Sequence, residues 1–292
     1  MIFVRQSFVL FGQFVRLTGW RGVVRVPGMK TLPKRMLVSV VFAALSAVLF
    51  TGCTTVPETG RRQFNFMSPS QEMQLGFSEF DKMKKEMPVS TNAAAHAMLQ
   101  RVGRRIAAVA PLEGAQWEFV LFESKEVNAF CLPGGKVGVY TGILPITKDE
   151  AGLATVIGHE VAHAVARHGG ERISTAMGLQ MVGVVVDAAS ASSKYHGAFV
   201  TGYGLGSQLG VALPHSRMQE SEADRMGLIY MARAGYDPEA AVGFWQRFAD
   251  FNNKAGGQTP WFLRTHPLDE TRIRDLQKWM PEAKAQFRPA AN

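Results

Sequence analysis

Apolar residues recur at helical spacing along most of the chain and alternate at strand spacing in one short stretch. Two helices are predicted first, over 68–85 and 91–110, and each follows a Ser, Thr or Pro of the kind that begins helices. Alternating residues then predict strands over 117–122, 127–132 and 136–141, the last two joined by a Pro-Gly-Gly turn. Helical spacing returns after this sheet. The order predicts an α+β fold, mostly helical with one small sheet.

The most continuous apolar stripe lies in the segment after the sheet. Thr147-Lys148-Asp149-Glu150 has the pattern of a capping box and predicts a helix start. Apolar side chains follow at helical spacing up to His168-Gly169-Gly170, where we expect the helix to end. His159 and His163 fall in the middle of this helix, where the backbone geometry is firm.

His159-Glu160-Val161-Ala162-His163 carries the clearest chemical signal. Two imidazoles four residues apart lie about 40° apart around a helix and about 6 Å apart along it, so both can bind one metal ion. Glu160 lies between them, where it can contact a water beside the metal. A lone histidine is more often structural, but the pair with the enclosed glutamate is typical of zinc-dependent hydrolases.

A third protein ligand is predicted in a second helix. Ser216-Arg217-Met218-Gln219 follows Pro214 as a capping-box pattern, and it places Glu220 and Asp224 one turn apart on one face. Glu222 lies about 200° around the helix from Glu220 and faces elsewhere. We expect Glu220 to bind the metal and Asp224 to accept a hydrogen bond from a ligating histidine. The alternative is an ordinary charged face in water.

Two other metal chemistries fit the residues less well. A metzincin needs a third histidine six residues after His163, but that position is Gly169, and His168 lies about 140° from the metal-binding face. We therefore interpret His168 as structural. Two histidines and a carboxylate can also hold non-haem iron, but the intervening glutamate has no evident task in an oxygenase, so one Zn²⁺ per chain is the better interpretation.

Three segments together resemble a known family. HEVAHAVARHGGER, SRMQESEADRMG and Arg264-Thr265-His266-Pro267 are similar to segments of the HtpX, LoiP and BepA group of gluzincin metallopeptidases, relatives of the CAAX prenyl proteases. The resemblance runs from about residue 60 to 274 and includes the segment NAFCLPGGK. It implies a zincin-like fold, zinc ligands His159, His163 and Glu220, and Glu160 as the base. It also implies a lipoprotein form without the TPR array of BepA-like members, since the chain ends soon after a last helix.

The resemblance also points to His266 and to one strand. Pro267 holds His266 out of a regular helix, where it either stabilises the oxyanion of the attacked carbonyl or binds zinc at rest, and we favour the resting ligand, with 252–259 as hinge. The alternative is a histidine that caps a helix or packs on Trp261.

In zincin-type folds an edge strand before the catalytic helix pairs with extended substrate, and the candidate residues are Lys136, Val137, Gly138, Val139 and Tyr140. An ordinary sheet strand is the alternative.

The basic charge of the chain lies in its first residues. Residues 1–52 contain seven Lys or Arg and no acidic residue, which leaves 25 basic and 24 acidic residues in the rest. A nucleic-acid partner is therefore not indicated. Lys34-Arg35 precede an apolar run over 36–50 that is too short to span a bilayer, so this segment is interpreted as a secretory signal, with 1–28 as an extension before the true start at Met29.

The signal ends in Leu49-Phe50-Thr51-Gly52-Cys53, which resembles a bacterial lipobox. Cys53 would then carry the lipid, 53–67 would be an exposed tether, and 68–292 would be one metallopeptidase domain. A signal without lipidation is the alternative.

Cys131, between Phe130 and Leu132, is expected to be a buried thiol without a chemical role. Residues 177–213, rich in Gly, Ala and Val, are expected to be mobile helices packed on the domain, which touch a membrane or cover the cleft.

These residues predict a zinc endopeptidase, lipid-anchored at the periplasmic face of a bacterial outer membrane. Zinc would acidify a water, Glu160 would take its proton, and the same proton would pass to the leaving amine. The resemblance implies misfolded or misassembled envelope proteins as substrates and the outer-membrane assembly machinery as a partner. The contrasting hypothesis is a zinc-containing chaperone or assembly factor whose proteolysis is incidental.

Overall fold

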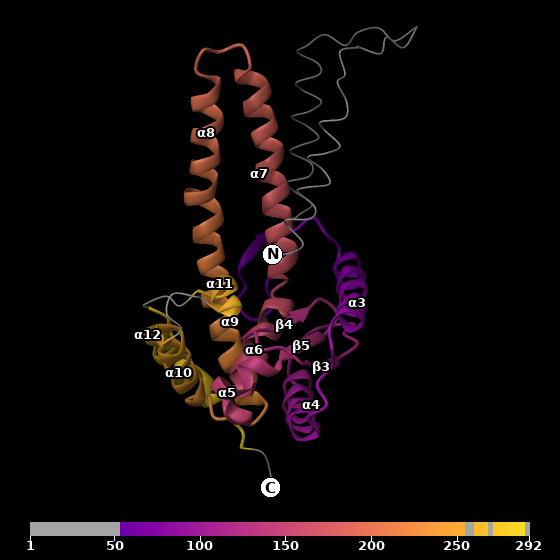
Figure 1. Ribbon diagram of the computed structural model, residues 1–292. Coiled ribbons are helices and arrows are strands. Elements are labelled where there is room, and N and C mark those ends of the chain that lie inside the picture. Colours follow the sequence, from indigo (N-terminus) through magenta and orange to yellow (C-terminus); the bar gives the residue numbers. More distant parts are fainter. Residues whose placement is uncertain (1–52, 255–259, 268–270, 290–292) are drawn as a thin grey trace. The chain divides into compact units, whose positions relative to one another are not determined.

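Helices make up most of the structure, and a small sheet precedes the central helix (Figure 1). The computed structural model describes residues 53–254, 260–267 and 271–289. The first two predicted helices are α3 (Pro69–Glu86) and α4 (Ala93–Ala107), and the predicted strands are β3 (Glu118–Phe122), β4 (Ala129–Leu132) and β5 (Lys136–Tyr140). The predicted α+β class is confirmed. The expected signal segment and most of the expected hinge, 255–259, lie outside the described residues.

The chain after β5 is helical. Its elements are η1 (Thr141–Ile143), α5 (Leu144–Thr147), α6 (Glu150–Val165), α7 (His168–Ser190), α8 (His196–Ser207), the π-helical η2 (Gln208–Ala212), α9 (Leu213–Arg233), α10 (Ala240–Lys254), α11 (Trp261–Thr265) and α12 (Arg272–Ala285). Two predicted helix starts are wrong. Asp149, not Thr147, caps α6 by accepting from the Gly152 N–H at 2.8 Å. Ser216 caps nothing, because α8, η2 and α9 continue into one another without a break.

Strand β5, the last strand before α6, is central in its sheet. The strand order is β3–β5–β4, and β5 runs parallel to β3 and antiparallel to β4. The expectation that Lys136–Tyr140 is a substrate-binding edge strand is therefore wrong, since its backbone groups are already paired on both sides. The Tyr140 N–H donates to the Asn128 carbonyl oxygen at 3.0 Å. Successive residues of an antiparallel strand point their N–H groups alternately toward the partner strand and away from it. The N–H groups of Ala129 and Cys131 therefore point away from β5, toward the free edge of β4. In the described part of the chain no further strand pairs with that edge.

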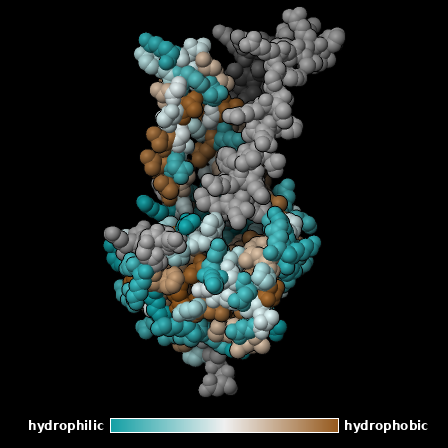
Figure 2. Space-filling view, viewed as in Figure 1, coloured by the Kyte–Doolittle hydropathy of each residue, from teal (hydrophilic) through white to brown (hydrophobic). Residues whose placement is uncertain are grey.

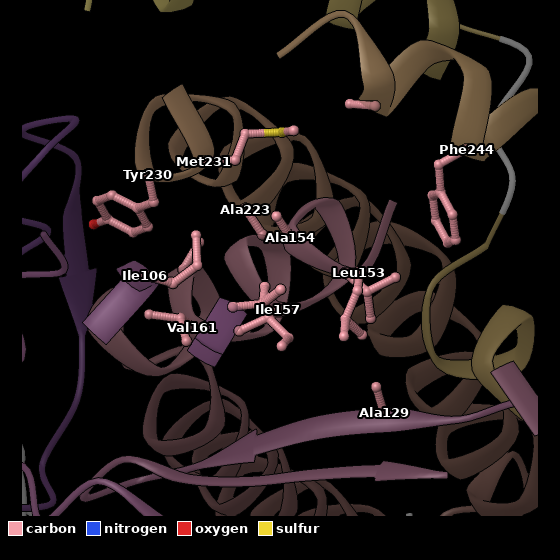
Figure 3. Packing of buried hydrophobic residues seen from close by; sticks show 14 of the residues in the cluster. Ile106, Ala129, Leu153, Ala154, Ile157, Val161, Ala223, Tyr230, Met231 and Phe244 are labelled. Atoms are coloured by element: carbon pink, nitrogen blue, oxygen red, sulfur yellow. The ribbon is translucent and has the colours of Figure 1, made fainter. Parts of the chain in front are cut away.

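Helix α6 lies at the centre of the hydrophobic core, where it packs on α4, α9, α10 and β4 (Figure 3). Its apolar side chains Leu153, Ile157 and Val161 are fully or almost fully buried. At Gly158 and Gly227, α6 and α9 approach so closely that a Cβ on Gly158 would lie 2.9 Å from the Gly227 carbonyl oxygen. Larger residues at these two positions would push the helices apart.

The segment 53–67 is part of the folded structure, so the expectation of an exposed tether is wrong. Strands β1 (Cys53–Thr55) and β2 (Arg62–Phe64) form an antiparallel hairpin. Val56 is fully buried, and the Gln63 side chain donates to the Ala166 carbonyl at 2.8 Å. Apolar burial and a buried amide hydrogen bond hold this hairpin on the domain. Cys53 is exposed at the start of β1.

Arg61 joins this hairpin to the first turn of α7 and to the middle of α9. Its Nη1 and Nη2 donate to Glu171 at 2.7 and 2.9 Å, and its Nε donates to Glu222 at 2.7 Å. His215 Nε2 and the Gln219 amide also contact Glu171, at 2.9 and 2.6 Å. Burial by itself would raise the pKa of Glu171, but these hydrogen bonds and the Arg61 charge outweigh it and lower the pKa to about 2.

Helices α7 and α8 form a hairpin that extends away from the core (Figure 1). The expectation that this region packs on the domain is wrong, because most of its large apolar side chains are exposed. In the described residues, α7 is also long and apolar enough to cross a membrane, and only 11% of its most apolar 18-residue window is buried. The possibility that α7 crosses a membrane rests here on the length and the composition of the helix alone.

Glu171→Gln should weaken the loss of stability in acid. The lowered pKa means that ionised Glu171 stabilises the fold above pH 4.5, and that this contribution disappears as the pH falls towards about 2. The shift corresponds to at most about 3 kcal/mol. Denaturant unfolding at pH 7 and pH 3 should show a larger loss for the unmodified protein than for the variant. The exposed Glu86→Gln is the control, and identical pH dependence with and without Glu171 would contradict the expectation.

Candidate metal centre

Three helices bring the predicted metal-binding residues together. His159 and His163 come from the middle of α6, and Glu220 comes from the facing helix α9. His266 ends α11 in a non-helical conformation, as expected from Pro267, and its N–H donates to the Phe262 carbonyl at 2.8 Å. All four side chains are buried, and one ligand atom from each lies within 4.8 Å of the others.

Five distances within this cluster are close to the spacing of ligands around one zinc ion. His159 Nε2 lies 3.1 Å from His163 Nε2, 3.1 Å from His266 Nδ1 and 3.3 Å from Glu220 Oε2. Glu220 Oε1 lies 3.3 Å from His163 Nε2, and Glu220 Oε2 lies 2.8 Å from His266 Nδ1. Four ligands at about 2.0 to 2.1 Å in a tetrahedron lie about 3.3 Å apart.

The residues present also fit a zinc ion chemically. Glu220 Oε1 and Glu160 Oε1 are buried and accept no hydrogen bond from the described residues. A buried carboxylate oxygen without a donor is costly unless a cation compensates it. Three imidazole nitrogens and one carboxylate form a donor set that zinc commonly accepts. The cluster is therefore consistent with zinc, and it contains the three expected ligands together with His266, the residue expected to bind zinc at rest.

Asp224 lies behind His159, as its place on α9 predicts. Asp224 Oδ1 is 2.9 Å from His159 Nδ1, so it can accept a hydrogen bond from Nδ1–H and leave Nε2 free for the metal. Arg272 holds this carboxylate with Nη2 at 2.7 Å from Oδ1 and Nε at 2.7 Å from Oδ2, and its guanidinium lies 3.5 Å from the Trp245 ring centroid. Sequence reasoning missed Arg272, since an arginine in the last helix gives no local signal of this contact.

His168 and Glu222 form a second support, behind His163. His168 Nδ1 lies 2.8 Å from His163 Nδ1, and His168 Nε2 lies 3.0 Å from Glu222 Oε2. If His163 binds metal through Nε2, its Nδ1–H donates to His168, which in turn donates to Glu222. Glu222 faces away from the metal as predicted, but it is buried and bonded to Arg61. The interpretation of His168 as a merely structural residue missed this chain.

The surroundings of His159 and Glu160 raise the pKa of both side chains. Burial lowers the pKa of His159, but the hydrogen bonds to Asp224 and Glu220 outweigh it and raise the pKa to about 9. Burial raises the pKa of Glu160. His266 Nε2 lies 3.3 Å from Glu160 Oε1, so His266 contacts both the metal-binding atoms and this carboxylate.

The other predicted residues lie outside the cluster. Cys53 and the residues of β5 contribute no atom to it. Cys131 lies on β4, and burial together with the negative charge of Glu160 raises the pKa of its thiol. A raised pKa disfavours the thiolate, which is the reactive form, and the effect of the Glu160 charge places β4 next to the site.

Comparison with known proteins gives a consistent result. The model of peptidase family M48 matches residues 93–280. The chain is 37% identical to the mitochondrial metalloendopeptidase OMA1 of Schizosaccharomyces pombe, over 84% of this chain and 72% of that protein. It is 29% identical to the OMA1 of Saccharomyces cerevisiae, over 85% of this chain and 75% of the relative. It is 27% identical to the beta-barrel assembly-enhancing protease of Escherichia coli K12, over 85% of this chain and 52% of the relative.

Glu222→Gln should weaken zinc binding although Glu222 contacts no metal-binding atom. The amide can no longer be a purely accepting partner for His168, so the tautomer and orientation of His163 are less firmly held. We expect the zinc affinity to fall about 10- to 100-fold, measured by competition with a chromophoric chelator. Glu86→Gln is the matched control. Unchanged affinity in Glu222→Gln would show that His163 needs no support from this side.

Proposed function

The chain belongs to peptidase family M48 and is a zinc metalloendopeptidase, and from this we propose that it degrades misfolded or misassembled envelope proteins at a membrane surface. The observation that carries the peptidase function is the buried cluster His159, His163, Glu220 and His266 with Glu160 beside it. The envelope substrate class is supported by the similarity to a beta-barrel assembly-enhancing protease. Outer-membrane assembly machinery is the partner that this similarity favours.

Glu160 is the residue that moves the proton in this proposal. Zinc in the cluster would polarise the scissile carbonyl and acidify a water molecule. Glu160 takes the proton of that water and returns it to the leaving amine, a task suited to a carboxyl whose pKa is raised by burial. Asp224, held by Arg272, keeps His159 in the tautomer that binds metal.

His266 is the resting fourth ligand in this proposal. Its Nδ1 has the same spacing to His159 and Glu220 that the other ligands have among themselves, and its Nε2 faces Glu160. In that position the imidazole takes the place that water needs and also covers the base. Substrate binding must therefore move His266 away before Glu160 can act.

The site of action is the periplasmic face of the outer membrane, with a lipid on Cys53. The support is the lipobox-like ending of the apolar segment and the exposure of Cys53 at the first described position. Because β1 is folded onto the domain, a lipid on Cys53 would hold the metal centre close to the bilayer. The domain boundaries 1–52 and 53–292 follow from this proposal.

Glu160→Gln should retain zinc but lose proteolysis. The amide keeps the shape of the side chain and cannot accept a proton, so casein cleavage should fall by about 10³-fold or more while one zinc ion per chain remains. Cleavage is measured by peptide release and zinc by metal analysis. Glu86→Gln controls for loss of an exposed charge. If the variant cleaved casein normally, the assigned base would be wrong; if it lost cleavage but fully replaced the protein in cells, the chaperone hypothesis would be favoured.

His266→Ala separates the two roles of this histidine. Loss of a resting ligand that blocks water should leave the cleavage rate of an unfolded substrate equal or higher and should lower zinc affinity modestly. Loss of an oxyanion donor should instead reduce turnover by about 10²-fold or more. The measurement is kcat on casein-derived peptides with zinc content determined in parallel. His196→Ala, in the α7–α8 hairpin, is the matched control.

Cys53→Ala tests the anchor directly. We expect the protein in cells to lose incorporation of labelled palmitate and to lose processing to an N-terminal Cys53, because the thiol is the only group that the modification can use. Mass spectrometry of the mature N-terminus gives the readout. Cys131→Ala is the control and should incorporate palmitate normally. Identical N-termini and labelling in both variants would rule out the lipoprotein assignment.

A further inference from the structure

The outward sides of α7 and α8 carry the largest group of exposed apolar side chains among the described residues. Figure 2 shows hydrophobic residues along this hairpin. Val184 and Val185 of α7 are each 64% exposed, and Leu205 of α8 is 60% exposed. The other exposed members, from α7 through η2 to the first residue of α9, are Ile173, Met177, Met181, Val182, Tyr195, Phe199, Val200, Leu209, Val211 and Leu213. Scattered apolar residues on a protein surface are ordinary, but a continuous surface of this kind needs a partner.

Charged residues are confined to the two ends of the hairpin. The stretches 173–186 and 197–213 contain no Asp, Glu, Lys, Arg or His. Asp187, Lys194 and His196 gather at the tip, and Glu171 and His215 belong to the buried network at the base. An uncharged apolar belt bounded by charges at both ends is the distribution that a bilayer selects.

The glycines of α8 and η2 give an independent reason. Gly197, Gly202, Gly204, Gly206 and Gly210 have nothing within 4 Å of the position that a Cβ would take, so none of them serves close packing within this chain. Glycine is among the least favourable residues in a helix exposed to water. In the hydrocarbon layer no water competes for the backbone hydrogen bonds, so a helix tolerates glycine better there. Glycine is more frequent in membrane helices than in helices of soluble proteins.

We propose that the α7–α8 hairpin inserts into the hydrocarbon layer of a lipid bilayer. The charge-free residues 173–186 of α7 extend about 21 Å, so they reach through much of a hydrocarbon layer about 30 Å thick. The exposed apolar positions of α7 cover about half of its circumference, whereas a second protein copy would cover a narrower stripe. Lipid chains, unlike a second folded protein, can cover the whole curved apolar surface of two helices. This insertion is independent of the peptidase reaction.

Fluorescence quenching by lipids tests the proposal in the full chain. Cys53→Ser and Cys131→Ala remove both native thiols. Single cysteines are then placed at Val182 on α7, at Leu205 on α8, or at Val89 as control, and each is labelled with the fluorophore NBD. Val89 is a matched control because it is 47% exposed, against 49% for Val182, and lies on the domain outside the hairpin. The proteins are reconstituted with phosphatidylethanolamine–phosphatidylglycerol vesicles that carry doxyl groups on the acyl chains. Each labelled protein must first bind one zinc ion per chain, as the unlabelled protein does.

Labels at 182 and 205 should be quenched by the doxyl lipids at least about fivefold more than the label at 89, because only the hairpin enters the hydrocarbon. They should also be protected from aqueous iodide once vesicles are added. Labels at 182 and 205 that stay accessible to iodide and unquenched by lipid would overturn the proposal. Protection from iodide without vesicles, rising with protein concentration, would also overturn it and would identify a second copy as the partner.

Discussion

The close crossing of α6 and α9 is the constraint on which the rest of the site depends. Gly158 and Gly227 face one another with so little space that a Cβ on either would lie 2.9 Å from the backbone of the other helix. Ala154, Ile157, Ala223 and Met231 fill the remainder of this contact (Figure 3). Only at this short separation can a glutamate of α9 reach between two histidines of α6. The metal centre therefore depends on apolar packing of small residues, although none of them has a polar group near the metal.

A second layer of polar residues holds the ligands from behind. His159 is supported by Asp224 and Arg272, and His163 by His168 and Glu222. Each support ends on an arginine, so the buried carboxylates are compensated whether or not the imidazoles carry charge. Two glutamates of α9, two positions apart, thus serve opposite sides of one histidine pair. Glu220 belongs to the metal-binding atoms, and Glu222 belongs to the supports.

The support behind His163 also connects distant parts of the chain. Glu222 bonds to Arg61 of the β1–β2 hairpin, and Arg61 bonds to Glu171 in the first turn of α7. The first described strands and the base of the apolar hairpin therefore meet in one ionic network next to a metal ligand. A displacement of either hairpin would reach His163 through the contacts of Arg61 with Glu222, of Glu222 with His168 and of His168 with His163. This arrangement explains why the segment 53–67, expected as a tether, is ordered and partly buried.

Local patterns determined much of this protein. Periodicity predicted the helices and the three strands, because burial of one face acts over a few residues and leaves a repeat in the sequence. The spacing of His159, Glu160 and His163, and the shared face of Glu220 and Asp224, also follow from the geometry of a single helix. Tertiary structure decided the rest. Contacts between segments far apart in the chain decided three features. They made β5 the central strand of its sheet, they set which residue lies behind each histidine, and they left α7 and α8 extended away from the domain. The sequence leaves no local repeat for such contacts, so Arg61, His168, Glu222 and Arg272 became recognisable only when the fold brought them together.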